Sequence, residues 1–313
     1  MPLYLLSQAK VRKLDQTNFR SEKELQTLIE TNLPLLFGSR FVATEFSTGA
    51  KHAGRIDTLA LDENDNPMII EYKVIESSDL INQSLFYLSW LDDHRGEFEL
   101  TARKKLGDKI EFDWDKIRVI CISPGFKKYD MHAVGMMGAN IELWQFQLHE
   151  EDILDIDKVF PRSDRDYETG LSASNGKNPI MIAAGRKAAE TRRTATYTFV
   201  EHLKGKDQTI MEIVTALREY ILALAETIEE APKKLYIAYK VSQNFVCMEV
   251  QKRKVYLFLK LNPSEVGKLP IHFRDVSNIG HYGTGDIECT ISSLEQIDEA
   301  KLWIKKAFDS VAG

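Results

Sequence analysis

Residues 54–61 read GRIDTLAL and residues 67–74 read PMIIEYKV, and these two segments decide how the first half of the chain folds. Both are rich in Ile and Leu, as buried strands are. Between them lie Asp62–Asn66, five residues of turn-forming type. The sequence therefore predicts a β-hairpin with strands at Arg55–Leu61 and Pro67–Val74.

The register of this hairpin follows from its loop. If Leu61 faces Pro67, the residue numbers of every cross-strand pair add up to 128. Asp57 then lies opposite Glu71. A side-chain period of two puts Lys73 on the same face as Glu71. Facing carboxylates destabilise a strand pair, so this arrangement is best tolerated with a cation between them. The alternative is a surface hairpin with a plain salt bridge, because the three-residue pattern is short and common.

A helix is expected to begin after Ser21, since Ser21 and Glu24 have the spacing of a capping box. Leu25, Leu28, Ile29 and Leu33 then recur at helical spacing. Glu22 borders this apolar stripe, whereas Glu24 is rotated away from Glu22 by roughly 200° and serves as the cap. A carboxylate beside a stripe that faces the core needs a partner, so Glu22 is a fourth candidate site residue.

A second helix is predicted from about Ser78 to Asp92. Gln83 and Tyr87 lie four residues apart on it and therefore on one face, although the helix is otherwise largely apolar. Further strands are predicted at Arg40–Phe46, Ile117–Ser123 and Asn140–Gln147. This order of helices and strands predicts an α/β domain over residues 1–160, with a mixed central sheet flanked by helices.

Residues 161–178 are rich in Ser, Asp, Asn and Gly and are typical of a linker. A helix is predicted at Ile180–Arg193, and residues 161–195 are assigned to a linker with this basic helix. Its basic residues are candidates for contacts with a nucleic-acid backbone, although a solvated helix face is the commoner explanation of such a pattern. They are Arg186, Lys187, Arg192 and Arg193.

Residues 196–313 are predicted to form a smaller α+β domain. It begins with a long helix at Asp207–Glu230 and ends with a helix at Ser293–Val311. Between them strands are predicted at 234–241, 245–250, 255–261 and 286–291. The Gly-rich segment Gly280–Gly285 either binds a ligand or forms a turn, and its spacing is not that of a phosphate-binding loop. Candidates for a binding surface are Tyr239, Asn244, Phe245, Arg274 and Asp275.

The charge is unevenly distributed along the chain. The whole chain has a formal net charge of −6, and residues 1–160 hold 19 Lys and Arg against 27 Asp and Glu. This balance argues against tight, non-specific DNA binding by the first domain without a cation. Three scattered cysteines, Cys121, Cys247 and Cys289, are expected to be core residues in a reducing compartment. With no apolar run of membrane-spanning length and no secretory signal, a cytoplasmic location and no membrane partner are expected.

Taken together, the motifs resemble those of the PD-(D/E)XK nuclease superfamily, in the branch of RecB-like and NucS-like nucleases. Residues 54–57 (GRID) match its Asp motif, residues 70–73 (IEYK) its Glu-x-Lys motif, and residues 83–87 (QSLFY) its Gln-x-x-x-Tyr motif. Glu22 is similar to its first-helix Glu, while Ile56 replaces the Pro that often precedes the Asp. The resemblance covers about residues 20–150 and implies a restriction-endonuclease-like fold.

The second half resembles a C-terminal domain family of unknown function that accompanies nuclease-like domains labelled as "predicted transport" proteins. No transport mechanism follows for a chain with no apolar run of membrane-spanning length. Its matching stretches include residues 236–240 (YIAYK) and 280–283 (GHYG).

The resemblance implies a Mg²⁺- or Mn²⁺-dependent deoxyribonuclease, an endonuclease of defence or repair, acting on single- or double-stranded DNA. Asp57, Glu71, the Tyr72 carbonyl and Glu22 would hold the metal, as hard cations prefer such oxygen ligands. Lys73, Gln83 and Tyr87 would complete the catalytic set, and Arg55 would contact a phosphate. The alternative is a catalytically silent nucleic-acid-binding or regulatory protein that keeps the fold. Whether the chain forms a homodimer is left open.

Overall fold

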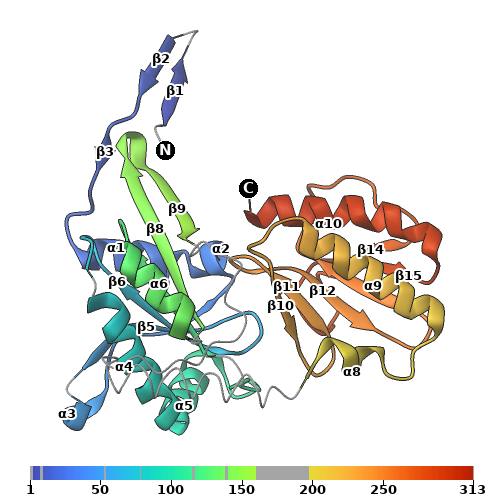
Figure 1. Cartoon of the computed structure of the whole chain (residues 1–313), viewed down its shortest axis with the longest axis horizontal. Coiled ribbons are helices and arrows are strands. Elements are labelled where there is room, and N and C mark those ends of the chain that lie inside the picture. The colour runs from blue at the N-terminus through green and yellow to red at the C-terminus, as the bar shows by residue number, and fades with distance from the viewer. Residues whose placement is uncertain are drawn as a thin grey trace. The chain divides into compact units, whose positions relative to one another are not determined.

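The computed structural model describes residues 3–7, 10–52, 54–77, 79–114, 117–137, 140–159 and 197–312. The chain forms two compact units, each with a sheet of its own (Figure 1). The first holds the described residues up to 159 apart from 34–39, which group with the second unit at 197–312. The basic residues of the predicted linker helix, Arg186, Lys187, Arg192 and Arg193, lie outside the described residues.

The first unit is built on a mixed, seven-stranded sheet. The strands β6, β7 and β8 are parallel to one another, and the remaining pairings are antiparallel. Across the sheet the order is β3 (Gln16–Thr17), β8 (Ile141–His149), β7 (Arg118–Ser123), β6 (Pro67–Tyr72), β5 (Arg55–Leu61) and β4 (Arg40–Ser47), and β9 (Ile153–Val159) also pairs with β8.

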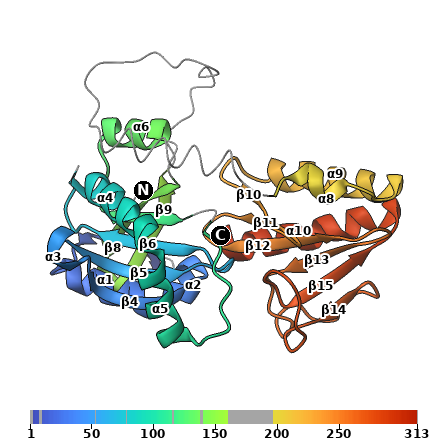
Figure 2. The same ribbon diagram turned by 90° about the horizontal axis from the view of Figure 1, so that it is seen from below.

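The helices α1 (Glu22–Thr31) and α4 (Asp79–Asp93) cover opposite faces of this sheet (Figure 2). Thr58 on β5 faces α1, because its hydroxyl donates to Glu30 at 2.7 Å. Cys121 on β7 faces α4, where its thiol contacts the Ser84 hydroxyl at 3.1 Å. The other helices of this part of the chain are α2 (Leu33–Phe37), α3 (Gly49–His52), α5 (Arg95–Leu106), α6 (Lys128–Met137) and the short η1 (Glu150–Asp152).

The predicted hairpin is confirmed in position and register. Leu61 pairs with Pro67 and Leu59 with Ile69, both as the loop length requires. Strand β6 ends at Tyr72, two residues before the predicted end, although the Lys73 amide still donates to the Ile122 carbonyl at 2.9 Å. The helices α5 and α6 and the strands β3 and β9 were not predicted, because their apolar patterns are weak or short.

An N-terminal hairpin of β1 (Tyr4–Ser7) and β2 (Lys10–Lys13) forms a separate two-stranded sheet. All eight of its strand residues are exposed. Arg12 anchors the hairpin through ion pairs with Glu150 and Glu151. A two-stranded ribbon of this kind is only marginally stable by itself.

The second unit has a six-stranded antiparallel sheet with two long helices on one face. The helices are α9 (Gln208–Ala223) and α10 (Ile297–Ala312), and their apolar stripes pack on the inward-facing residues of the strands. The strand order is β10 (Glu229–Pro232), β11 (Ile237–Lys240), β12 (Asn244–Val250), β13 (Val255–Leu259), β15 (Ile287–Ile291) and β14 (Phe273–Asp275), with α8 (Phe199–Leu203) and η2 (Leu294–Gln296) outside the sheet.

The predicted helix at Asp207–Glu230 was too long. Helix α9 ends at Ala223, and Glu229–Pro232 form the edge strand β10 instead. An edge strand tolerates Pro232, which lacks a backbone N–H. The carboxylate of Glu230 is also held by the Arg218 guanidinium at 2.6 Å, which fixes β10 against α9.

The Gly-rich segment has a structural role in the described chain. A Cβ at Gly283 would lie 2.6 Å from the Cβ of Cys247, and Gly283 has a φ of +82° that favours glycine. His281 stacks on Phe258 with ring centroids 4.2 Å apart. The segment therefore closes over the sheet face opposite the helices, which supports the turn interpretation.

The three cysteines are buried and free, as expected of core residues. Burial raises the pKa of Cys121 and of Cys289 to about 12, so neither is a reactive thiolate at neutral pH. No helix within the described ranges is long and apolar enough to cross a membrane.

Candidate active site

The site lies where the hairpin strands β5 and β6 stop pairing. Their ladder ends at Thr58 and Ile70, one step short of Asp57 and Glu71. Beyond it, the Asp57 amide donates to Glu71 Oε1 at 3.1 Å, and the Tyr72 amide donates to Asp57 Oδ2 at 3.1 Å. Each carboxylate thus accepts from an amide of the opposite strand. The predicted opposition of Asp57 and Glu71 takes this interlocked form.

Both carboxylates are shielded from water, Glu71 more fully than Asp57. Glu71 is only 3% exposed and Asp57 is half-buried. Burial raises the pKa of Glu71 well above its ordinary value, and repulsion from Asp57 raises it further. Burial likewise raises the pKa of Asp57, although the Tyr72 amide and the Lys73 charge oppose this. Two acids held together in a poorly hydrated place are stabilised by a cation or by protons.

Lys73 and Glu22 form an ion pair beside the carboxylates. The Lys73 ammonium lies 3.3 Å from Glu22 Oε2, and the Lys73 side chain is 20% exposed. Glu22 is the first residue of α1, where Ser21 Oγ caps the helix by accepting from the Glu24 amide at 3.1 Å. The Glu24 carboxylate accepts from the Arg20 amide instead. Glu22, rather than Glu24, is therefore the α1 carboxylate that lies beside the hairpin.

Gln26 fixes the backbone at the site, and sequence reasoning missed it. Its side-chain amide donates to the Asp57 carbonyl at 2.7 Å and to Glu30 Oε1 at 3.0 Å. Glu30 also accepts from Thr58, whose hydroxyl lies 3.1 Å from that of Tyr72. A polar residue one turn after Glu22, on the buried face of an amphipathic helix, was the available signal.

Tyr87 reaches the hairpin from α4. Its hydroxyl accepts from the Arg55 amide at 3.2 Å. Gly54 makes this approach possible, because a Cβ there would lie 2.8 Å from Tyr87 Cε1. Burial raises the pKa of Tyr87, and the nearby charges of Glu71 and Asp57 add to this, so the hydroxyl stays protonated near neutral pH.

Gln83 is not brought into the site. Its side chain is exposed and makes no hydrogen bond within the described chain. Arg55 is exposed as well, with its Nε 2.5 Å from Glu45 Oε2. Glu45 was not predicted, yet its charge raises the pKa of both Asp57 and Glu71. It lies on β4 between Thr44 and Phe46, the partners of Thr58 and Ile56, and so beside Asp57 in the register.

The oxygen donors of the site suit a hard divalent cation. Among the described residues, Asp57 Oδ1 and Glu71 Oε2 accept no hydrogen bond and are available to an incoming ion. Those residues contain no group of three His, Cys, Asp or Glu that could hold a metal. Mg²⁺ is commonly held by only one or two carboxylates, with water and substrate phosphate as its other ligands. The donor set therefore fits Mg²⁺ better than a metal that needs an all-protein cage.

Comparison with known proteins places the chain in a family. It is 30% identical over 314 residues to an uncharacterized protein of Haemophilus influenzae, covering 98% of this chain and 99% of that protein. The chain belongs to this protein's family. Residues 200–311 match a domain of unknown function, DUF5655, in agreement with the expectation for the second half.

Two solved structures are similar to part of this chain. One is an EndoMS–dsDNA complex, with 19% identity, a TM-score of 0.29, and coverage of 42% of this chain and 47% of the solved one. The other is a repair endonuclease from Pyrococcus abyssi, with 16% identity, a TM-score of 0.22, and coverage of 41% and 48%. The chain spans about half the length of each.

Proposed function

We propose that this chain is a divalent-metal-dependent nuclease that hydrolyses phosphodiester bonds of DNA, and that it acts as an endonuclease in defence or repair. The observation that carries the proposal is the interlocked pair Asp57 and Glu71, two mutually repelling carboxylates that lie where two strands separate, each with an oxygen that accepts no hydrogen bond among the described residues. The motif order around the pair agrees with the PD-(D/E)XK resemblance stated above.

Asp57 and Glu71 would hold Mg²⁺ or Mn²⁺, with the Tyr72 carbonyl as a further ligand. Glu22 would hold a second ion or bind the first through a water molecule. Its ion pair with Lys73 also orients the Lys73 ammonium. A bound cation supplies charge neutralisation at the scissile phosphate and makes a nearby water more acidic. Both effects are what hydrolysis of a phosphodiester needs.

The chain's own residues supply the positioning. The Lys73 ammonium, held by Glu22, would donate to the attacking water or to a phosphate oxygen and offset developing charge. Gln26 donates a hydrogen bond to the Asp57 carbonyl, and the Tyr87 hydroxyl accepts one from the Arg55 amide, near the point where β5 and β6 stop pairing. These contacts fix the reacting groups before substrate arrives, which is the main contribution of a protein to such a reaction.

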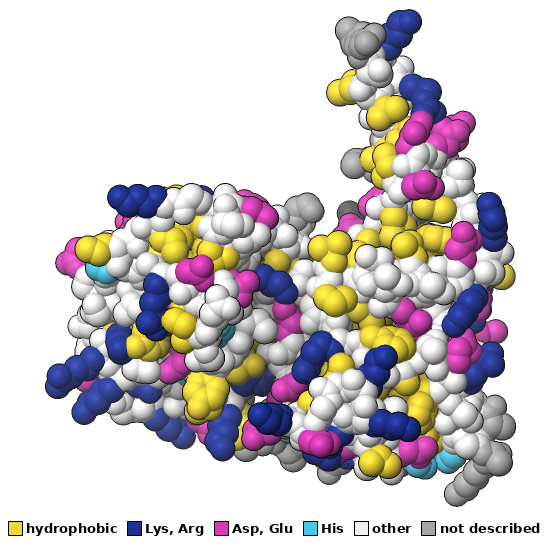
Figure 3. Space-filling model, turned by 180° about the vertical axis from the view of Figure 1, so that it is seen from behind, with side chains coloured by type: hydrophobic (Ala, Val, Ile, Leu, Met, Phe, Trp, Pro, Cys, Tyr) yellow, Lys and Arg dark blue, Asp and Glu magenta, His cyan; other side chains and the backbone are white. Residues whose placement is uncertain are grey.

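The protein is acidic as a whole, and on the face seen in Figure 3 Lys and Arg side chains are interspersed with Asp and Glu. With a net charge of −6 the protein depends on the cation to bring a phosphate to the two carboxylates. DNA binding at these two carboxylates and cleavage should therefore respond together to the divalent cation.

The test is cleavage by the purified full chain. Circular and linear DNA, single- and double-stranded, are incubated with Mg²⁺ or Mn²⁺ and, in parallel, with EDTA. We expect cation-dependent cutting, including of circular DNA, which only an endonuclease opens. Asp57→Ala should abolish it, whereas the matched change Asp108→Ala at an exposed acidic residue should not.

The outcome also decides the alternative, a silent nucleic-acid-binding protein that keeps the fold. One observation favours that alternative: the Gln83 side chain is exposed and makes no hydrogen bond within the described chain. Tight DNA binding without cleavage, and without stabilisation by Mg²⁺ or Mn²⁺, would replace the nuclease proposal by it.

A further inference from the structure

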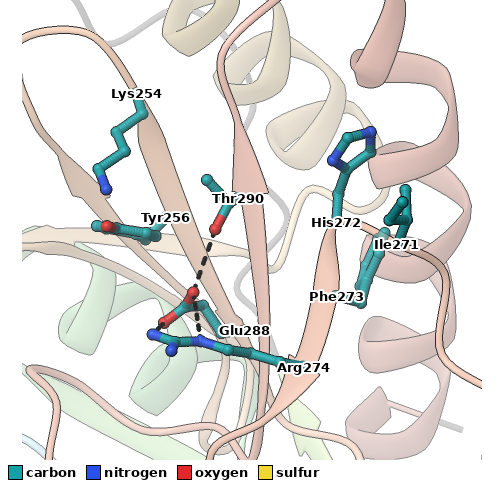
Figure 4. Close-up of a pocket in the computed structure, with 8 residues that line it drawn as sticks. All are labelled: Lys254, Tyr256, Ile271, His272, Phe273, Arg274, Glu288 and Thr290. Carbon is teal, nitrogen blue, oxygen red and sulfur yellow. Dashed lines mark hydrogen bonds and ion pairs between the residues drawn. The ribbon is translucent and has the colours of Figure 1, made fainter.

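The second unit has an open pocket that no proposed role explains. It lies on β13, β14 and β15 and measures about 350 Å³, which is large enough for a nucleotide. Tyr256 pairs with Thr290 and Arg274 with Glu288, and these residues alternate with those that pack against α9 and α10. The pocket is therefore on the face opposite the helices. Its lining is Lys254, Tyr256, Ile271, His272, Phe273, Arg274, Glu288 and Thr290 (Figure 4).

The charges of the pocket leave a net positive group. Arg274 binds the buried Glu288 through Nε at 2.9 Å and Nη2 at 2.6 Å, and Thr290 donates to the same carboxylate at 3.1 Å. Glu288 is thus matched within the pocket, and Arg274 Nη1 has no acceptor among the described residues. Lys254 has no carboxylate partner in the described chain. An anion could therefore bind to Arg274 Nη1 and to the Lys254 ammonium, which lie on the same face of the sheet.

The pocket also offers flat and apolar surface. The Tyr256 ring is half-buried, and the Lys254 ammonium lies 4.6 Å from its centroid. Ile271 is 92% exposed at the rim, an unusual position for a large apolar side chain. The flexible Lys254 side chain can turn from the ring to a phosphate and leave the ring open to a planar partner.

We propose that this pocket binds a nucleotide, with its phosphate at Lys254 and Arg274 Nη1 and its base on Tyr256 beside Ile271. An aromatic platform next to basic side chains is how proteins hold unpaired nucleotides without reading their sequence. The ligand would be a free mononucleotide or one unit of a single-stranded DNA. The proposal goes beyond hydrolysis at Asp57 and Glu71 and needs no residue of that site.

The test is a binding titration of the full chain in EDTA, so that hydrolysis plays no part. A fluorescent, single-stranded oligodeoxynucleotide is the probe. Tyr256→Leu should weaken binding by about 5- to 150-fold, the range set by the loss of one stacked base. Lys254→Gln should weaken it and lower the slope of log K against log salt by about 0.7, the value for one lost phosphate contact on a single strand.

Two controls separate this site from the proposed active site. Lys252→Gln removes an exposed lysine of the same turn and should change neither affinity nor salt slope, and Asp57→Asn should bind like the wild type. Full competition by dAMP identifies the free nucleotide as the ligand, and no competition identifies the strand. Equal binding of an abasic strand, or unchanged affinity in both pocket variants, would overturn the proposal whatever the cleavage assay shows.

Discussion

Two glutamates of the first sheet are equally buried but have very different partners. Glu142 on β8 and Glu71 on β6 are each 3% exposed. Glu142 is surrounded by donors, with Arg118 Nε at 2.5 Å, Lys158 Nζ at 3.3 Å and Trp144 Nε1 at 3.1 Å. Glu71 receives one backbone amide and faces Asp57.

Under the proposed function, the difference separates a structural carboxylate, Glu142, from one that would bind a cation, Glu71. A buried charge is ordinarily paired within the protein, as Glu142 is. The same sheet leaves Glu71 and Asp57 with like charge between them and a free oxygen each. Such an arrangement destabilises the metal-free fold and persists where a site needs it.

The largest effect on stability is expected on the structural side. Arg118→Met leaves Glu142 buried without its guanidinium partner and should lower the free energy of unfolding by about 3–5 kcal/mol. Denaturant unfolding measures the loss. The double change Arg118→Met with Glu142→Gln removes the orphaned charge and should recover part of it. A loss below about 1 kcal/mol for the single change would show that Glu142 needs no partner, and the comparison would fail.

The next largest effect is expected on the functional side and on activity alone. Lys73→Ala should reduce cation-dependent cleavage by about 10²–10³-fold, as loss of a charge-stabilising donor does. Its ion pair with the 45% exposed Glu22 contributes little stability, so unfolding should change by less than about 1 kcal/mol. The exposed lysine change Lys128→Ala is the control. Full activity in Lys73→Ala would remove this residue from the proposed catalytic set.

Much of this comparison could be predicted from sequence, and its limits have physical reasons. The hairpin and its register follow from a period of two and a short loop, and Glu22 follows from the helix cap and stripe. Gln26 and Glu45 escaped prediction because their roles depend on which strand lies next to them. Gln83 was placed correctly on a helix face, but a helical period does not say how far that face extends toward the site.

A smaller and opposite effect is expected from Glu71→Gln. Gln keeps an acceptor for the Asp57 amide but removes the repulsion, so the metal-free protein should become more stable by about 1–3 kcal/mol at neutral pH. Thermal unfolding in EDTA measures this, with Glu76→Gln on the surface of the same unit as control. A destabilised Glu71→Gln protein would contradict the claim that the carboxylate pair is a strained site.

The same raised pKa values give the wild type a pH dependence. The folded state retains protons on Glu71 and Asp57 that the unfolded chain releases above the ordinary carboxyl pKa of 4.5 or 3.8. Their contribution to the free energy of unfolding is therefore fully present below the ordinary values and is lost as pH rises from these values through the raised ones. The stability gap between Glu71→Gln and the wild type, measured in EDTA, should widen over that window. A constant gap would show that the pKa of Glu71 is ordinary.

The smallest effect is expected at Arg55, which is exposed and paired with Glu45. Arg55→Gln should change the free energy of unfolding by less than about 1 kcal/mol, because exposed ion pairs contribute little. If Arg55 contacts a phosphate, DNA affinity should fall modestly and the salt slope should drop by about 0.9 on duplex DNA. An unchanged slope would assign Arg55 to the Glu45 pair alone.

A Mn²⁺ titration of the full chain, followed by thermal unfolding, tests whether Asp57 and Glu71 form a cation site. We expect the wild type to be stabilised by about 2.7 kcal/mol when free Mn²⁺ reaches 100 times its Kd. Glu71→Gln should lose most of this gain, and the structural variant Arg118→Met should keep it. No Mn²⁺ stabilisation of the wild type, or an equal gain in Glu71→Gln, would contradict the claim.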